Sequence, residues 1–535
     1  MLQSIDHSSW APHLMAVAGF GSWDWVIVIA YLIIVIAVGA FVGRTGRSKD
    51  EFFLASRQMP IWAVALSVLA TSQSAATFIG GPQQAYLGNL TYFAGNLGAL
   101  IAVIIVGLVF LPAFYRQGVT SIYEIVGQTC GPLAQKCASG MFMVGRVFAS
   151  GARLYIVAIP FSLIAFGDIE PIQMMISILV IAIGATIYTV LGGIRAVIWT
   201  DVLQSVVYIS TVIVALIILW NKIPLSFGET VEALQTTSKG NKLKLINTSL
   251  SLTEPWTIWS IIFGMSLFNL AAFGTDQDLA QRMLTCRNAR SGMWAILWAN
   301  IVTWPVLILF LAIGLLLAIF YGMPQIMGDA GGTLPDNDTR KVFLVFILEE
   351  LPAGIRGLML AGLFAAAMSS IDSALNAMAS TSVADFYRPW HRWRHGREPD
   401  ARVELRVSRA AVACWALALV LFAVGCVIVQ HNAENRVSLI DFALGVMVFA
   451  YSGLLGVFLT ILLTPRGNAW SAIAALIVGF AAVWLMRQDH IRIEVEPDTY
   501  RPLWFGWQML IATSLSVVVC AIGSRSPSQG PKTVS

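Results

Sequence analysis

The feature that most constrains this chain is a series of long, uninterrupted apolar runs that recurs along almost its whole length. Many of these runs reach the roughly 20 residues that an α-helix needs to cross about 30 Å of hydrocarbon. Of the 535 residues, 57% are apolar and only 12% are charged, which is far more apolar than an ordinary soluble domain. Because lipid offers the backbone no hydrogen-bond partners, such runs must form helices. We therefore predict an all-α, polytopic membrane protein.

Apolar runs separated by turn signals predict about 13 membrane-spanning helices. Their expected starts are Trp23, Ile61, Tyr92, Leu133, Ile172, Ala196, Trp256, Gly292, Gly357, Val407, Val437, Trp470 and Leu503. Basic residues gather after the first and ninth of these helices, in residues 44–57 and 388–402, so both segments are expected in the cytoplasm. Alternation then places the N-terminus outside and the C-terminus inside a cell (inner or plasma) membrane. Residues 221–254 fall outside by this count although they contain four lysines, and long segments follow the charge rule less strictly.

Two of the predicted helices are interrupted by polar residues and glycines at matching positions. The second contains SVLATSQSAATFIGGPQQAY and the seventh contains SLFNLAAFGTDQDLAQR. Unpaired backbone groups in hydrocarbon cost several kcal/mol each, so irregular segments persist only where they line a site or cavity. Because the interrupted helices are five apart, the pattern predicts an inverted repeat of five plus five helices.

The predicted organisation has six parts. It comprises an extracytoplasmic N-terminus (1–22), an extra first helix (23–43), a first five-helix repeat (61–220), a second repeat (256–462), two additional helices (463–523) and a cytoplasmic tail (524–535). The net charge is only +4, with basic residues in short loops, so no nucleic-acid partner is expected.

The predicted ninth helix carries one polar stripe on an otherwise apolar span. Ser369, Asp372, Ser373 and Asn376 follow one another at i, i+3, i+4 and i+7. Hydroxyl and carbonyl oxygens suit a hard monovalent cation, because they replace part of its hydration shell. An ionisable group in mid-span costs at least about 2.5 to 3.5 kcal/mol, which marks Asp372 as a candidate for an ion or proton path. Asp201 is a second candidate, unless it lies close enough to the inner interface to be solvated.

Four short segments together give the chain a family resemblance. GGIRAVIWTDVLQ (192–204), FLASRQMP (53–60), DQDLAQR (276–282) and MSSIDSALNAMAS (368–380) resemble the sodium:solute symporter family, over roughly residues 25–465. The resemblance implies a LeuT-type fold and sodium-coupled import of a small organic solute. A membrane enzyme is disfavoured, because HExxH, GxSxG and His–Cys clusters are missing from the sequence.

The resemblance also implies where sodium binds. A first site would use the backbone carbonyls of Ala70, Gln73 and Ala366 with the hydroxyls of Ser369 and Ser370. A second site, present in some members, would use Asp201, Ser369, Asp372 and Ser373. Asp372 stands where the family usually has serine, and it would either strengthen a cation site or carry a proton instead. The number of cations therefore stays open, as does the oligomeric state.

The solute residues point away from the sugar-carrying branch of the family. That branch has a Glu-Gln pair where this chain has Ala76 and Thr77, and a tyrosine where it has Ala272, although Asn269 matches its binding asparagine. The hydroxyls of Ser72, Ser74 and Thr77 instead resemble the sialic-acid branch. Sugars, inositols and amino acids remain alternatives, as does a transport-like solute sensor.

The sialic-acid branch pairs its substrate carboxylate with an arginine on the helix that here begins near Leu133. Arg146 and Arg153 are two helical turns apart on that helix, so they can share one face. Arg146 either reaches the cavity or extends to the inner surface. Arg153 is expected to lie deeper, where its guanidinium would form two parallel hydrogen bonds with a carboxylate. Asn96 is a further solute candidate.

Overall fold

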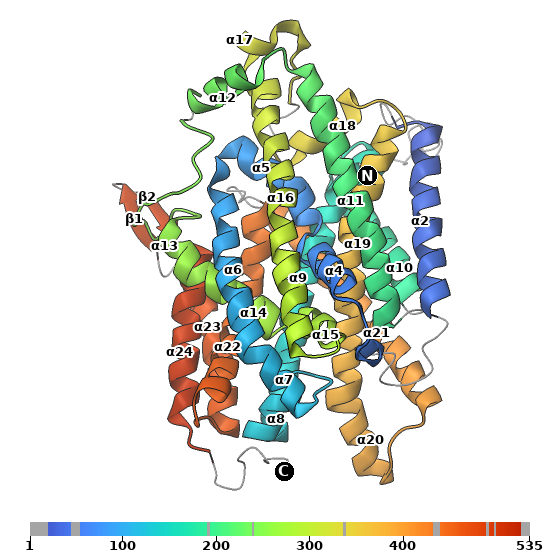
Figure 1. Cartoon of the computed structure of the whole chain (residues 1–535), viewed down its shortest axis with the longest axis vertical. Coiled ribbons are helices and arrows are strands. Elements are labelled where there is room, and N and C mark those ends of the chain that lie inside the picture. Colours follow the sequence, from blue (N-terminus) through green and yellow to red (C-terminus); the bar gives the residue numbers. More distant parts are fainter. Residues whose placement is uncertain are drawn as a thin grey trace, which may run out of the picture.

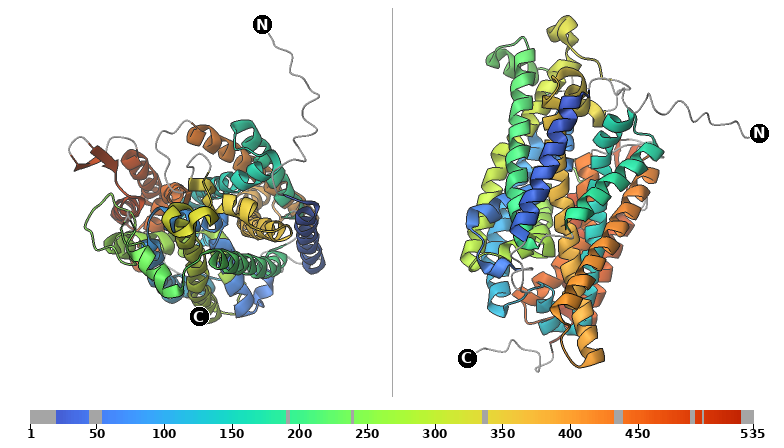
Figure 2. Two further views of the ribbon diagram at one scale, coloured as in Figure 1. Left: turned by 90° about the horizontal axis from the view of Figure 1, so that it is seen from above. Right: turned by 90° about the vertical axis from the view of Figure 1, so that its right-hand side faces the viewer.

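The computed structural model describes residues 20–43, 54–189, 193–237, 240–334, 339–431, 439–487, 492–496 and 499–525. In these residues the chain is a bundle of helices that run mostly along the long axis of the molecule (Figure 1). A small antiparallel hairpin, β1 (Arg492–Glu496) and β2 (Thr499–Pro502), lies at the edge of the bundle (Figure 2). The predicted all-α class is thus confirmed, with one hairpin that the sequence did not suggest.

The predicted spans correspond to helices in order along the chain. The main helices are α2 (Ser22–Gly43), α4 (Ile61–Ser72), α5 (Ala75–Leu87), α6 (Gly95–Ile105), α7 (Leu111–Gln117), α9 (Pro132–Phe166), α10 (Pro171–Thr189), α11 (Ile194–Lys222), α14 (Ser266–Gly274), α15 (Gln277–Leu284), α16 (Ala289–Gly322), α19 (Ile355–Thr381), α21 (Ala401–His431), α22 (Leu439–Leu463), α23 (Ala469–Arg487) and α24 (Phe505–Ile522). Among the described residues, ten single helices and two bent pairs are long and apolar enough to cross a bilayer, and α10 is a shorter apolar helix. Val437, one predicted start, lies outside the described residues.

Both predicted interruptions are present as sharp bends. α4 and α5 meet at 62°, and the segment Ile258–Gly274 meets α15 at 58°. In the first bend Ser74 has an extended backbone and its hydroxyl accepts a hydrogen bond from the amide of Ala76. In the second, the carboxylate of Asp276 accepts from the amide of Asp278. Each bend therefore ends one helix and caps the start of the next with a short polar side chain.

The second half of the first broken helix, α5, is held by close packing. A Cβ added to Gly314 of α16 would lie only 2.2 Å from the carbonyl oxygen of Pro82 in α5. Since no side chain fits there, glycine lets the two backbones touch. α2 is attached in a different way, because Asp24 accepts hydrogen bonds of 2.7 Å from the amides of both Gly354 and Gly357 at the start of α19.

The lysine-bearing segment 221–254 uses its charges locally. It includes α12 (Phe227–Gln235), which lies at the opposite end of the bundle from the basic helix α20 (Arg388–His395) (Figure 1). Lys242 donates hydrogen bonds to the carbonyls of Tyr86 and Gly88 at the end of α5, and Lys222 pairs with Glu350 at 2.7 Å. These contacts give a structural reason for lysines in a segment that the helix count predicts to lie outside; Lys239 lies outside the described residues.

Candidate functional site

The first bend brings together residues of the predicted first sodium site. Ser370 of α19 donates to the carbonyl of Thr71, at 3.4 Å, and to that of Ala366, at 3.3 Å. Because α4 ends at Ser72, its last carbonyls have no amide partner in a following turn. Ala70 lies in this last turn, and Gln73 occupies the bend itself. Carbonyl and hydroxyl oxygens from two helices therefore converge here, although Ser369 points its hydroxyl elsewhere.

The hydroxyl of Ser369 belongs to a second cluster, centred on Asp201 of α11. The Asp201 carboxylate accepts hydrogen bonds from Ser369, at 2.6 Å, and from Ser67, at 2.5 Å. The guanidinium of Arg282 is 3.1 Å from the same carboxylate. Asp201 is fully buried, so the alternative that it is solvated at the inner interface is wrong.

The other predicted residues of the second site lie in the same cluster. Ser373 accepts a hydrogen bond from Arg282 and donates one to the carbonyl of Ser369. Asp372 accepts from the amide of Ser373 at 2.7 Å and is also fully buried. The sequence contained Arg282 in the family-like run DQDLAQR but gave it no role. Its partners come from three other helices, so only the folded chain reveals them.

The second bend is dominated by charge. Arg146 of α9 forms an ion pair with Asp276, with Nη2 to Oδ2 at 2.5 Å, and it lies 3.2 Å from Asp278. The hydroxyl of Tyr451 donates to Asp276 at 2.6 Å. Arg146 is only 2% exposed, so it does not extend to the inner surface, and that alternative is wrong. Neither Asp276 nor Asp278 was identified from the sequence, where they appear only as polar residues after a break.

One cavity lies between the two bends, and residues from both bends line it. All six predicted solute residues contribute to its wall: Ser72, Ser74, Thr77, Asn96, Arg153 and Asn269. Asn96 and Asn269 each donate an amide hydrogen to a carbonyl just before their own helix, that of Phe93 and that of Met265, which leaves the amide oxygen for other contacts. Asn300 and Thr303 of α16 and Tyr451 of α22 also line the cavity and were not predicted.

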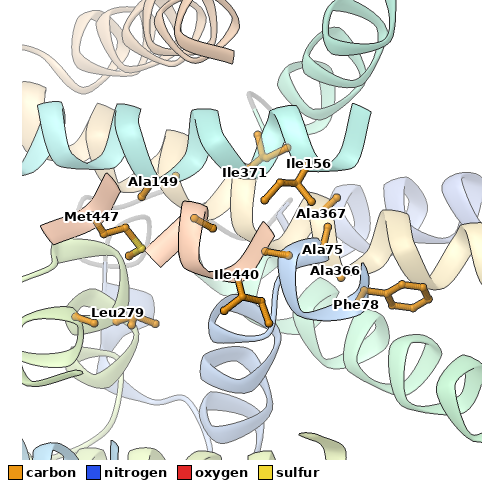
Figure 3. Close-up of a cluster of buried hydrophobic side chains, with 14 of the residues drawn as sticks. Ala75, Phe78, Ala149, Ile156, Leu279, Ala366, Ala367, Ile371, Ile440 and Met447 are labelled. Atoms are coloured by element: carbon orange, nitrogen blue, oxygen red, sulfur yellow. The ribbon is translucent and has the colours of Figure 1, made fainter. Parts of the chain in front are cut away.

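Apolar side chains close the rest of the wall. Figure 3 shows Leu279, Ile440 and Met447 within a buried cluster that α5, α9 and α19 complete. The three residues also border the cavity. Polar contacts are thus few and placed at defined points, as in sites that bind small molecules.

Arg146 and Arg153 both line this cavity, but their surroundings differ. Arg146 is neutralised by two carboxylates. Arg153 is almost fully buried and makes no ion pair or hydrogen bond within the described part of the chain. A buried guanidinium without a counterion is unfavourable, so an anion entering the cavity would be attracted to Arg153.

Two broken helices facing a shared polar cavity in a membrane bundle define a secondary transporter. Comparison with known proteins agrees. The model of the sodium:solute symporter family matches residues 52–479, so this chain belongs to that family. It is 29% identical to the sodium/sialic acid symporter NanT of Aliivibrio fischeri over 479 residues, covering 88% of this chain and 89% of that protein.

Two further comparisons extend the result. The chain is 27% identical to the sodium/sialic acid symporter SiaT of Proteus mirabilis, covering 88% of this chain and 91% of the relative. A solved structure of a Na⁺-coupled sialic acid symporter, in a substrate-bound outward-open state with a novel Na⁺ site, has a TM-score of 0.79 at 25% identity and covers 94% of this chain and 97% of its own.

These comparisons decide several predictions. The family resemblance and the LeuT-type fold are confirmed. The chain is a sodium-coupled symporter of a small organic solute rather than an enzyme, and it is a multi-pass membrane protein. The individual site residues stay predictions.

Proposed function

We propose that this symporter imports a carboxylate solute of the sialic-acid type. The observation that carries the proposal is Arg153, a buried guanidinium in the cavity wall that has no ion-pair partner in the part of the chain described. A carboxylate would supply the missing charge through two parallel hydrogen bonds. Two relatives of similar length are sialic acid symporters, which supports the same class of solute.

The rest of the cavity suits a solute with many hydroxyl groups. Ser72, Ser74 and Thr77 offer hydroxyls from the first bend, while Asn96 and Asn269 offer amide oxygens from α6 and α14. A simple fatty acid would offer these groups no further hydrogen bonds. A sugar acid would satisfy them, and a neutral sugar would leave Arg153 unpaired.

In this proposal the first sodium binds between α4 and α19. Its ligands are the carbonyls of Ala70, Gln73 and Ala366 with the hydroxyls of Ser369 and Ser370. The contacts of Ser370 with Thr71 and Ala366 support this placement, because they already draw the oxygens of both helices together. Sodium would stabilise the bend of the first broken helix and thereby shape the solute site beside it.

A second cation is proposed at Asp201, Asp372 and Ser373. Two buried carboxylates and a hydroxyl lie there around Arg282. The net charge moved per solute would reveal whether this second cation binds. Each charge that crosses about 100 mV contributes roughly 2.3 kcal/mol, so the voltage dependence of uptake reports that net charge. An anion with one sodium moves no net charge, whereas an anion with two sodium ions moves one.

The proposed orientation places the N-terminus outside the plasma membrane and the C-terminus in the cytoplasm. The basic helix α20 and α12, a helix within the lysine-bearing segment 221–254, lie at opposite ends of the bundle (Figure 1), which supports opposite sides of the membrane for them. Each of the two five-helix repeats predicted above contains one bend, in its first helix, which supports the proposed boundaries.

The test is uptake of N-acetylneuraminic acid into vesicles that contain the purified protein, with and without a sodium gradient. Sodium-dependent uptake is expected, and competition by other carboxylates, sugars, inositols and amino acids defines the class. Arg153→Gln should abolish uptake, while Arg394→Gln in the exposed α20 should not. Uptake of a neutral sugar that survives in Arg153→Gln would overturn the carboxylate assignment.

A further inference from the structure

Asp278 occupies a position that neither sodium site nor the solute site accounts for. It lies in the first turn of α15, directly after the second bend, and is 1% exposed. Its two carboxylate oxygens meet different arginines: Oδ1 is 2.5 Å from Nη1 of Arg282, and Oδ2 is 3.2 Å from Nη2 of Arg146. One carboxylate therefore joins two buried cations that belong to different sites.

The two arginines lead in opposite directions. Arg146 lines the solute cavity. Arg282 reaches Asp201, whose other partners include Ser369 at the cation sites. The contacts form one uninterrupted chain from the cavity wall to the cation cluster, with Asp278 in its middle.

The geometry points to Asp278 as the positioning residue that couples solute binding to cation binding; this inference rests on the carboxylate solute proposed above. In the structure Arg282 divides its guanidinium between Asp278 and Asp201. Arg146 divides its own between Asp276 and Asp278. Each arginine can therefore shift toward either of its partners, and a shift at one end changes the charge that Asp278 presents to the other.

The direction of the effect follows from charge. Nη1 of Arg146 has no hydrogen-bond partner among the described residues, so this arginine retains a donor for a solute. A solute held at Arg153 that also engages Arg146 weakens the contact of Arg146 with Asp278. Asp278 then attracts Arg282 more strongly, and Arg282 withdraws from Asp201. The freed carboxylate of Asp201 binds a cation more tightly, so solute and sodium favour each other's binding.

The test compares full-length purified protein with its Asp278→Asn variant. The dissociation constant for N-acetylneuraminic acid is measured at about 1 mM and about 100 mM sodium, and that for sodium is measured with and without the solute. In the native chain each ligand should lower the dissociation constant of the other about tenfold or more, within the usual range of coupling between sites. In Asp278→Asn the mutual effect should fall below about threefold.

Asp385→Asn is the matched control. Asp385 is also a buried aspartate, but its hydrogen-bond partners Ser121, Gln135 and Ser139 are neutral. This variant should keep the mutual effect. Asp278→Asn could instead weaken the binding of both ligands while each still changes the dissociation constant of the other by the native factor. In that case the residue is merely structural and the inference is wrong.

Two further arms separate the possible failures. If Asp278→Asn does not fold, the charge-balanced variant Asp278→Asn/Arg146→Gln replaces it and should lose the mutual effect as well. If the native chain does not bind N-acetylneuraminic acid, the proposed solute is wrong, and sodium binding alone then tests Asp278. Without Asp278, Arg282 should pair with Asp201 more fully, so sodium affinity should fall about threefold or more; an unchanged sodium affinity would overturn the inference.

Discussion

The two broken helices bend by nearly the same angle, 62° and 58°, yet their bends have opposite chemistry. Around the first bend lie backbone carbonyls and the hydroxyls of Ser72, Ser74 and Ser370. Around the second lie Asp276, Asp278 and Arg146, which form ion pairs. Bends of similar angle therefore differ in their side chains. The first presents neutral oxygens that suit a mobile cation, whereas the second holds an arginine guanidinium in ion pairs.

The difference shows that a bend alone does not define a sodium site. Neutral oxygens hold sodium weakly enough to release it, as transport requires. Carboxylates at the second bend are already occupied by guanidinium groups, which cannot leave the chain. The first bend is therefore suited to binding and release, and the second to transmitting a change in charge.

The largest expected effect comes from removing one partner of the ion pair at the second bend. Asp276→Ala would leave the buried Arg146 guanidinium with Asp278 as its one ion-pair partner among the described residues, and it should lower the free energy of unfolding by about 3 to 5 kcal/mol. Reversible unfolding in detergent micelles measures this. The double variant Asp276→Leu/Arg146→Met removes both charges and should recover most of the loss; equal loss in both would contradict the ion-pair explanation.

Arg153 should behave in the opposite way. Arg153→Gln removes a buried charge that has no ion-pair partner within the described structure, so the empty protein should become more stable. The same change should weaken the binding of a carboxylate solute by about 2 to 5 kcal/mol, because the buried charge pair between Arg153 and the solute is lost. Calorimetric titration measures the affinity and thermal melting measures the stability. A less stable empty protein would show that Arg153 is structural.

A smaller effect is expected at the first bend. Ser370→Ala removes one neutral oxygen from the proposed sodium site. It should weaken sodium binding by about 1.5 to 3 kcal/mol, with little change in the stability of the fold. The sodium concentration for half-maximal uptake measures it. Ser380→Ala is the matched control, because Ser380 lies in the same helix and, within the described part of the chain, its hydroxyl donates to the carbonyl of Ala377 alone. Equal effects of the two variants would remove Ser370 from the site.

The smallest expected effect lies at the C-terminal end of α5, the second half of the first broken helix. Lys242→Met removes the donor to the last carbonyls of α5 and should lower stability by about 1 kcal/mol, without changing sodium affinity. Thermal melting with and without sodium measures both. Lys244→Met, on an exposed lysine of the same segment, serves as the control. A change in sodium affinity would mean that this cap also shapes the bend.

Local features of the sequence were enough for much of the site. The breaks after Ser72 and Gly274 were predictable because polar residues and glycines interrupt apolar runs at both places. The six candidate solute residues lie on α4, α5, α6, α9 and α14 and in the first bend. They were proposed from the same interruptions and from the family resemblance, and all six line one cavity. The contribution of Asn300 and Thr303 could not be predicted, because α16 carries no such interruption.

The sequence by itself determined the class of protein, the order of the helices and the two bends, because hydrophobicity and backbone breaks are properties of neighbouring residues. Only the tertiary structure decided which arginine is neutralised and which is free. Arg146 and Arg153 lie on one helix, yet the partners of Arg146 come from α15, more than a hundred residues away. Charge pairing depends on distances of a few ångströms across the bundle, and these distances exist only after the helices have packed.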